Sequence, residues 1–376
     1  MKRFMAVLLA VLMLLSLAAC GGDSAETTTA APTTTAEPTT EATTVPETEE
    51  PTVEETTVPE TEPPTEPEPT EPEGISNPLN GTKSEDAVYD RPYAVAINNI
   101  KAAQPLSGVG QADEMIEALT EGGITRFLAV FSDLGSVEHV GSVRSARPVF
   151  IDLAQAFKAI YVHAGGSQQA YTQLSNSGYD HLDGLRGASS VFYRDSARLS
   201  AGYSREHTLF TEGDDIVALA AKKGITTTLS EPLDYGYQFT IYDAIEEGSA
   251  ATSVSVQFRK NGKLTTFAYD EELGFYRASQ YSKEMPDGNT GEAVTFENLL
   301  VLEVSTTSAG KYVFMDLTGH GSGWFASGGK MIPIQWSRDS NKVPFTFTTA
   351  SGEPITLKTG HTYIGLVPTG SPVSFA

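Results

Sequence analysis

The sequence of 376 residues has a single cysteine, Cys20, and no apolar run long enough to cross a bilayer. One cysteine excludes an intrachain disulfide and a zinc site built from several thiolates. The longest apolar run, from Met5 to Ala19, is shorter than the ~20 residues of a membrane-spanning helix. Such a run after a basic start is typical of a signal peptide.

The end of this run predicts a lipid anchor. It follows Lys2 and Arg3 and closes with the residues LAAC, ending at Cys20. That ending resembles the lipobox of bacterial lipoproteins, so residues 1–20 are predicted to be a lipoprotein signal peptide with Cys20 as the lipidated residue. The alternative is an ordinary secretory signal with an incidental cysteine. Two or more acyl chains on Cys20 suffice for stable anchoring.

Residues 21–74 contain no Lys, Arg, Phe, Tyr, Trp, Leu or Ile. Their fifteen acidic residues stand among Thr, Pro, Ala and Val, so this stretch cannot bury enough apolar surface to fold. We predict a disordered Thr/Pro/Glu-rich tether over residues 21–76. Extended at roughly 3.1 Å per residue, it would reach ~150 Å, enough to lift a domain through a cell wall. The predicted location is therefore the outer face of the cytoplasmic membrane of a Gram-positive cell.

The rest of the chain is mildly acidic and has no basic stripe. Beyond residue 74 it contains 23 basic and 33 acidic residues, a net charge of −10. Proteins that bind nucleic acid draw most of their affinity from neutralising phosphates. Nucleic acid is therefore not an expected partner.

Alternating apolar strands and helices predict an α+β fold. Residues 77–232 are predicted to form a mixed α/β layered domain, and residues 233–376 a mainly antiparallel β domain. The stripe of Ala112, Met115, Ile116 and Leu119, stopped by Gly122-Gly123, predicts a helix. A second helix is expected over residues 149–159.

One stretch in the first domain has the features of an anion site. Two serines and two arginines stand just before Pro148, where a helix is expected to begin and its free N–H groups favour a negative charge. Other polar residues follow the ends of predicted strands, where ligand crevices often lie. The predicted ligand-binding residues are Asn98, Arg126, Ser142, Arg144, Ser145, Arg147, His163 and Ser167.

Structural roles for these residues are the alternatives. Arg144 and Arg147 could pair with Asp133, Asp152 or Asp195 and fasten loops. His163 could be a hydrogen-bonded structural histidine, and Ser167 a helix cap, since the G-x-S-x-G pattern of a nucleophile is absent. His181, Asp183, Glu206 and His207 lack the spacing of a known metal motif, so no metal or cofactor is predicted.

Aromatic residues gather in the second domain near five glycines of residues 319–329. Trp324, Phe325 and Trp336 could stack on sugar rings of a wall polymer if they are exposed. The alternative is that they belong to the core of the sheet.

Several segments occur in a fixed order and carry a family resemblance. They are RPYAVAINN (91–99), EGGITRFLAVF (121–131), GSVRSAR (141–147), IYVHAGGS (160–167), LDGL (182–185), GHGSGWFASGGKMIPIQWSR (319–338) and KTGHTYIGLVP (358–368). Together they resemble the YerB-like family of bacterial lipoproteins. The resemblance implies a lipid-anchored α+β protein with a mixed N-terminal and a β-rich C-terminal domain, and it implies no activity. This chain has Glu206-His207-Thr208 where the family has Pro-His-Asn, which leaves any site built on that asparagine in question.

Three hypotheses for function follow. The first is a surface lipoprotein, not an enzyme, that binds an anionic cell-envelope component, a cell-wall polymer or an exported protein. The second is an envelope phosphotransferase or hydrolase acting on a phosphorylated or lipid-linked wall precursor: Arg126, Arg144 and Arg147 would hold phosphate, and His163 or Asp133 would move protons. The third, a solute-binding lipoprotein, is disfavoured by the long tether.

Overall fold

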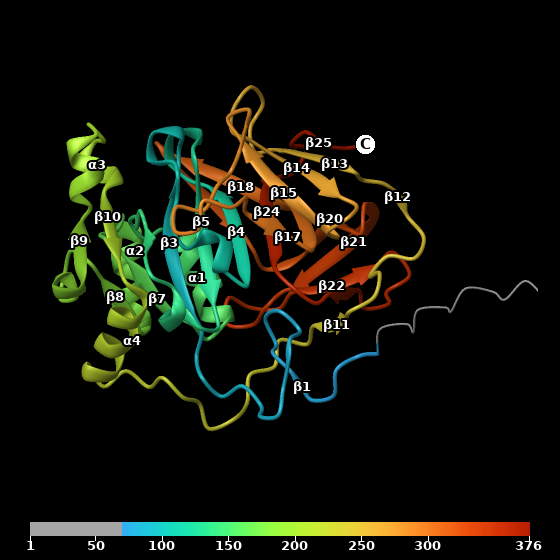
Figure 1. Ribbon diagram of the computed structural model, residues 1–376. Helices are drawn as coiled ribbons and strands as arrows, with labels where there is room; N and C mark the ends of the chain where they lie inside the picture. Colours follow the sequence, from blue (N-terminus) through green and yellow to red (C-terminus); the bar gives the residue numbers. More distant parts are fainter. Residues whose placement is uncertain (1–69) are drawn as a thin grey trace, which may run out of the picture. The chain divides into compact units, whose positions relative to one another are not determined.

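The computed structural model describes residues 70–376 (Figure 1). The predicted signal peptide, Cys20 and residues 21–69 of the predicted tether lie outside the described residues. Within residues 70–376, no helix has the length and apolar content needed to cross a membrane.

A twelve-stranded sheet runs through both halves of the described chain. Its strand order is β12-β21-β20-β18-β24-β4-β5-β3-β7-β8, and β19 and β22 pair with β18 and β21. The strands are β3 (Tyr93–Asn99), β4 (Glu114–Leu119), β5 (Thr125–Phe131), β7 (Ile160–His163), β8 (His181–Asp183), β12 (Ser249–Ala250), β18 (Asn298–Ala309), β19 (Tyr312–Asp316), β20 (Gly319–Ser327), β21 (Lys330–Arg338), β22 (Thr346–Thr349) and β24 (Thr362–Pro368).

The two halves meet at the pairing of β4 with β24. These strands are parallel, with Met115 opposite Tyr363 and Glu117 opposite Gly365, and they lie side by side in the middle of Figure 1. The predicted α+β class is confirmed, with strands in the majority in the second half. The predicted boundary at residues 232/233 remains a prediction.

The helix expected near residues 112–119 is wrong, because this segment is strand β4. All six residues from Glu114 to Leu119 are buried. A central strand covered on both faces need not alternate apolar and polar residues, so its apolar spacing can also match a helix. The segment's length, six residues between turns, is that of an ordinary strand.

A second, antiparallel sheet covers one face of the large one. Its order is β16-β15-β14-β13-β25, and β17 pairs with β15. The core between the sheets joins Ile97 and Phe127 of the large sheet to Val254 and Phe267 of the second. The strands are β13 (Ser253–Gln257), β14 (Leu264–Asp270), β15 (Phe275–Gln280), β16 (Lys283–Glu284), β17 (Thr295–Phe296) and β25 (Val373–Phe375).

Two helices, α1 (Pro148–Ala156) and α2 (Gln168–Ser177), cover the opposite face. Phe150 of α1 belongs to the core that contains Ala96 and Leu128 of the large sheet. Helix α1 starts at Pro148 as predicted and ends three residues before the predicted end. Ser167 caps α2 by accepting a hydrogen bond from the Ala170 N–H at 3.1 Å.

Trp336 belongs to the same core. It is buried and its indole N–H donates to the Glu303 carbonyl oxygen at 3.0 Å. Trp324 is half-buried, with its ring 6.0 Å from that of Phe375. These aromatic residues are therefore part of the packing between elements, as the core alternative holds.

The remaining elements are short. Three small sheets join β6 (Val140–Gly141), β10 (Leu209–Thr211) and β9 (Phe192–Arg194); β11 (Gln238–Thr240) and β23 (Thr356–Lys358); and β1 (Ile75–Ser76) and β2 (Lys83–Ser84). The other helices are α3 (Ser196–Ser200), α4 (Gly213–Lys222), and the 3-10 turns η1 (Lys101–Ala103), η2 (Val109–Gln111), η3 (Glu121–Gly123), η4 (Leu134–Ser136), η5 (Ser189–Val191) and η6 (Arg205–His207).

Candidate functional site

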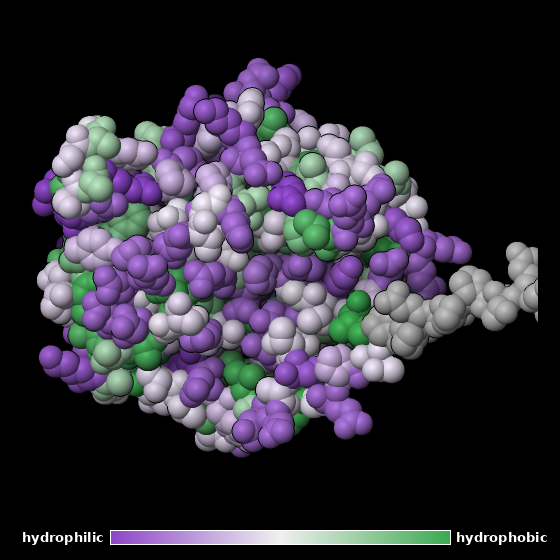
Figure 2. All heavy atoms as spheres, viewed as in Figure 1, coloured by the Kyte–Doolittle hydropathy of each residue, from purple (hydrophilic) through white to green (hydrophobic). Residues whose placement is uncertain are grey.

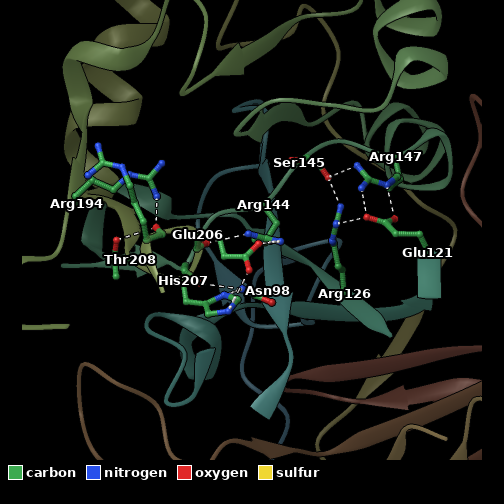
Figure 3. A network of polar contacts seen from close by, with 12 residues as sticks. Asn98, Glu121, Arg126, Arg144, Ser145, Arg147, Arg194, Glu206, His207 and Thr208 are labelled. Atoms are coloured by element: carbon green, nitrogen blue, oxygen red, sulfur yellow. Dashed lines mark hydrogen bonds and ion pairs between the residues drawn. The ribbon is translucent and has the colours of Figure 1, made fainter. Parts of the chain in front are cut away.

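The arginines of the predicted anion site form two groups, which Figure 3 shows side by side. In the first group, Arg126 lies near the start of β5 and is 2% exposed. Its guanidinium donates to the Ser145 carbonyl oxygen at 2.6 Å and to Glu121 Oε1 at 2.8 Å. Arg147, the residue before α1, donates through Nε to Glu121 Oε2 at 2.7 Å and through a second nitrogen to Oε1. We call Arg126, Arg147 and Glu121 the closed corner.

The electrostatics of the closed corner favour the charged pair. Burial alone would raise the pKa of Glu121, but the hydrogen bond from Arg147 and the charge of Arg126 outweigh it and lower that pKa to about 2. Burial, together with the nearby charge of Arg147, lowers the pKa of Arg126 to about 10. Glu121 and Arg126 are therefore both charged at neutral pH, and the single carboxylate of Glu121 bonds to both arginines.

The second group is more open. Arg144 donates to the Glu206 carbonyl oxygen at 2.8 Å and to its Oε2 at 3.2 Å, and the Glu206 side chain is 57% exposed. Arg194 donates to the Arg205 carbonyl oxygen at 2.5 Å. Burial, and then the charges of Arg205 and Arg144, lower the pKa of Arg194. These four residues are named the arginine cluster.

The arginine cluster has an excess of positive charge. Among residues 70–376, the contacts give Arg194 and Arg205 no carboxylate partner. The cluster therefore contains three guanidinium groups and a single carboxylate, that of Glu206, which bonds to Arg144. Neither group of arginines uses the partners considered from the sequence, Asp133, Asp152 and Asp195; the partners are Glu121 and Glu206.

Behind the arginine cluster, three buried polar side chains meet. Asn98, at the end of β3, donates to His207 Nδ1 at 3.1 Å and lies 3.3 Å from Ser142 Oγ. Because the amide nitrogen can only donate, Nδ1 of His207 accepts and the ring proton is on Nε2, 3.6 Å from Glu206 Oε1. Burial is the main cause that lowers the pKa of His207. The imidazole is therefore neutral, and it is held by Asn98 and not by Glu206, whose carboxylate lies beyond hydrogen-bond distance.

A surface hollow of about 330 Å³ adjoins this group. His207 and Ser204 lie in its wall, and Lys101, Gln104 and Tyr203 also line it. Arg205 stands between Ser204 and His207 in the 3-10 turn η6. A ligand in this hollow would thus lie beside the arginine cluster.

His163 and Ser167 lie elsewhere and have internal partners. His163 is fully buried; its Nδ1 donates to the Gly165 carbonyl oxygen at 2.8 Å, and its Nε2 accepts from His181 Nδ1 at 2.9 Å. Burial lowers its pKa to about 4. With both ring nitrogens occupied, these contacts favour the structural alternative for His163, and the helix cap does so for Ser167. Their role in ligand binding remains a prediction.

Asp133 is remote from the closed corner. It follows the end of β5, whereas Arg126 lies near the start of the same strand. At ~3.3 Å per residue, the two are roughly 20 Å apart. Asp133 cannot act on a group held by Arg126.

Sequence reasoning gave no role to Glu121 and Arg205, and it did not connect Glu206 and His207 with the arginines. Glu121 reaches Arg126 because β4 and β5 are paired through the turn η3, and the segment before that turn had been expected to be a helix. The pairing of β6 with β10 brings η6 next to Arg144. Thr208, at the place of the family asparagine, donates to the Arg205 carbonyl oxygen at 2.9 Å and so closes the same turn.

Comparisons with known proteins bear on the whole described chain. The family described as "Protein of unknown function (DUF3048)" matches with its N-terminal domain over residues 79–226 and with its C-terminal domain over residues 254–364. YerB of Bacillus subtilis (strain 168), a protein named as a lipoprotein, is 33% identical over 299 residues, which cover 77% of this chain and 86% of YerB. The crystal structure of B. subtilis YerB matches with a TM-score of 0.69 and 31% identity, over 80% of this chain and 99% of the solved chain.

Proposed function

This chain belongs to the DUF3048 family, and from that premise we propose that it is an exported lipoprotein that binds an anionic component of the cell envelope. The anchor is an acylated Cys20 on the outer face of the cytoplasmic membrane of a Gram-positive cell. The binding site is the arginine cluster together with the hollow that His207 lines. No catalytic step is part of the proposal.

The observation that carries the proposal is the excess charge of the arginine cluster. Arg194 and Arg205 have no carboxylate partner among the described residues, in a protein whose residues beyond 74 are acidic overall. Guanidinium groups recognise phosphate and carboxylate with two parallel hydrogen bonds. The buried Asn98, Ser142 and His207 support the segments that present them.

The closed corner has a different role in this proposal. Arg126 and Arg147 bond to Glu121 and to the carbonyl oxygens of Ser145 and Ala146. These bonds hold the segment between β6 and α1, which contains Arg144. The closed corner therefore positions a binding residue.

Two earlier hypotheses have less support. The enzyme alternative named two proton carriers, but His163 is buried with both nitrogens occupied and Asp133 lies at the far end of β5 from Arg126. For an exported protein partner, a broad apolar surface would be the usual sign. The face in Figure 2 has mostly hydrophilic side chains, with apolar ones in small separate groups.

The test measures anion binding by the full lipoprotein in phosphatidylcholine nanodiscs. The probe is a short glycerol-phosphate oligomer, titrated by calorimetry at low salt. We expect the double variant Arg194→Gln/Arg205→Gln to bind at least ~10-fold more weakly, a loss of about 1.4 kcal/mol.

The matched control removes two exposed cations at the end of α4, in Lys222→Gln/Lys223→Gln. It should keep the affinity within a factor of two. Equal losses of affinity in the two double variants would show that net charge alone matters and would contradict the proposed site. Absence of binding by the unaltered protein would contradict it as well.

A further inference from the structure

A second patch of positive charge lies away from the arginine cluster. A hollow of about 640 Å³ has Arg259, Lys260 and Lys311 in its wall, and no Asp or Glu. Among the described residues, none of these three cations has an ion-pair partner. Such a group is unexpected on an acidic protein unless it serves an anion. We call it the basic patch.

The three cations of the basic patch come from the second half of the chain, and Leu119, Gly122 and Gly123 of the first half complete the wall of their hollow. Arg259 and Lys260 belong to the connection between β13 and β14, and Lys311 to the turn between β18 and β19. The Arg259 guanidinium lies against the turn η3, because a Cβ built on Gly123 would be only 2.7 Å from one of its terminal nitrogens. Gly123 also has a φ of 76°, so glycine suits both its backbone and its neighbour.

Two more hollows connect the basic patch with the arginine cluster. The hollow beside the cluster shares Lys101 and Gln104 with a hollow of about 350 Å³. That one shares Gln280 and Tyr281 with a hollow of about 450 Å³, which in turn shares Gly123 with the hollow of the basic patch. The four hollows thus form a row in which each shares a wall with the next.

The row follows the junction between the two halves. Lys101 and Gln104 come from the first half, and Gln280 and Tyr281 from the second. This places the row on the side where the second sheet packs against the large one.

Positive charge continues along the row. Lys101 and Lys283 are exposed cations in the wall of its second hollow, and Glu284 is the one acidic residue in the four walls. Lys263 lines the third hollow, but its ammonium already donates to Asn99, Gln280 and Tyr281 at 3.3, 2.7 and 3.0 Å. Lys263 therefore shapes the wall, and the exposed cations are the ones free for a ligand.

We propose that this row binds one extended phosphodiester polymer, which runs from the arginine cluster along the junction to the basic patch. The proposal rests on the proposed function, because the arginine cluster forms one end of the path. A linear chain of phosphates presents a negative charge at each repeat, which matches cations spread along a row. The last hollow adds the hydroxyl groups of Thr306, Ser308, Thr369 and Ser371, which can donate to phosphate oxygens.

The experiment compares a short glycerol-phosphate oligomer with long poly(glycerol phosphate) on the full lipoprotein in phosphatidylcholine nanodiscs. The long polymer should bind at least tenfold more tightly per chain. Lys260→Gln/Lys311→Gln should lower the affinity for the long polymer at least fivefold and leave that for the short oligomer unchanged. Arg194→Gln/Arg205→Gln should weaken both.

Two further measurements sharpen this test. Lys283→Glu, in the middle of the row, should weaken only the long polymer. The salt dependence of long-polymer binding should become shallower by about 0.7 in log K against log salt for each cation removed from the row, if the value for single-stranded nucleic acids applies. Lys222→Gln/Lys223→Gln is the control, with no change expected in either measurement.

The outcomes separate this proposal from the proposed function. If Lys260→Gln/Lys311→Gln and Lys283→Glu bind the long polymer normally while Arg194→Gln/Arg205→Gln does not, the extended path is refuted and the proposed site stands. If the short oligomer depends on Lys260 and Lys311 instead, the proposed site at the arginine cluster is refuted. Polygalacturonate is a linear polyanion that has carboxylates in place of phosphates. If it bound as tightly as long poly(glycerol phosphate), the proposal that the ligand is a phosphodiester would be refuted.

Discussion

The closed corner and the arginine cluster both contain arginines from neighbouring segments. They differ in how these arginines are paired with carboxylates. In the closed corner, a half-buried carboxylate bonds to both Arg126 and Arg147. In the arginine cluster, the exposed Glu206 is the single carboxylate beside three arginines in the group and bonds only to Arg144. Burial and the ratio of carboxylate to guanidinium thus distinguish a structural arginine from one free for a ligand. Four predictions test this contrast.

The largest effect is expected from Glu121→Gln. It would leave two largely buried guanidinium groups without their carboxylate, so we expect the free energy of unfolding to fall by about 3 kcal/mol. Urea unfolding followed by circular dichroism measures this. Glu206→Gln is the matched control and should cost less than ~1 kcal/mol, because exposed ion pairs contribute little. Similar losses of unfolding free energy in both variants would show that the closed corner is no more structural than the arginine cluster.

The second prediction concerns pH. Because the folded state lowers the pKa of Glu121 to about 2, its stabilising effect is present above the ordinary carboxylate pKa and is lost as the pH falls through about 2. The difference in unfolding free energy between the unaltered protein and Glu121→Gln should therefore shrink steadily from about pH 5 downwards. A difference that stays constant over this range would show that Glu121 does not act through its charge.

The third prediction compares the two arginines on either side of Ser145. Arg147→Gln should lower the free energy of unfolding by about 2 kcal/mol and weaken binding of the short oligomer by the folded protein less than twofold, because Arg147 positions the segment of Arg144 and does not itself contact the ligand. Arg144→Gln should change stability by less than ~1 kcal/mol and weaken that binding about fivefold. If Arg147→Gln weakened binding and Arg144→Gln lowered stability, the closed corner would be the binding site and the arginine cluster the structural group.

The smallest effect is expected for the change in ligand affinity caused by Glu206→Gln. Its carboxylate competes with an anionic ligand for Arg144, so its removal should raise the affinity two- to threefold, which is about 0.5 kcal/mol. The same calorimetric titration measures it. A clear loss of affinity would mean that Glu206 positions the arginines more than it competes for them.

Local signals in the sequence were reliable where a single segment decides the outcome. Pro148 starts α1 and Ser167 caps α2, as predicted, because both features depend on the backbone of one helix end. The α+β class followed from the spacing of apolar residues within segments. Strand β4 was missed because both of its faces are buried in separate cores and one of its edges pairs with β24, far away in the sequence, and its own apolar spacing carries no sign of these contacts.

The candidate site shows the same limit. The run of arginines and serines predicted a stretch of positive charge, but its carboxylate partners come from elsewhere: Glu121 through the β4–β5 turn and Glu206 through the β6–β10 pairing. No spacing rule connects Arg147 to Glu121 or Arg144 to Glu206, since 26 and 62 residues separate them. The row of hollows likewise needs residues from both halves.

By itself, the sequence determined the acidic composition, the predicted anchor and tether, the helix ends and the general class of fold. These features follow from local chemistry, because each depends on residues that are neighbours along the chain. Only the tertiary structure decided which arginines are neutralised from within and which have no carboxylate partner. That outcome depends on the distance between charges, and the pairing of distant strands sets this distance.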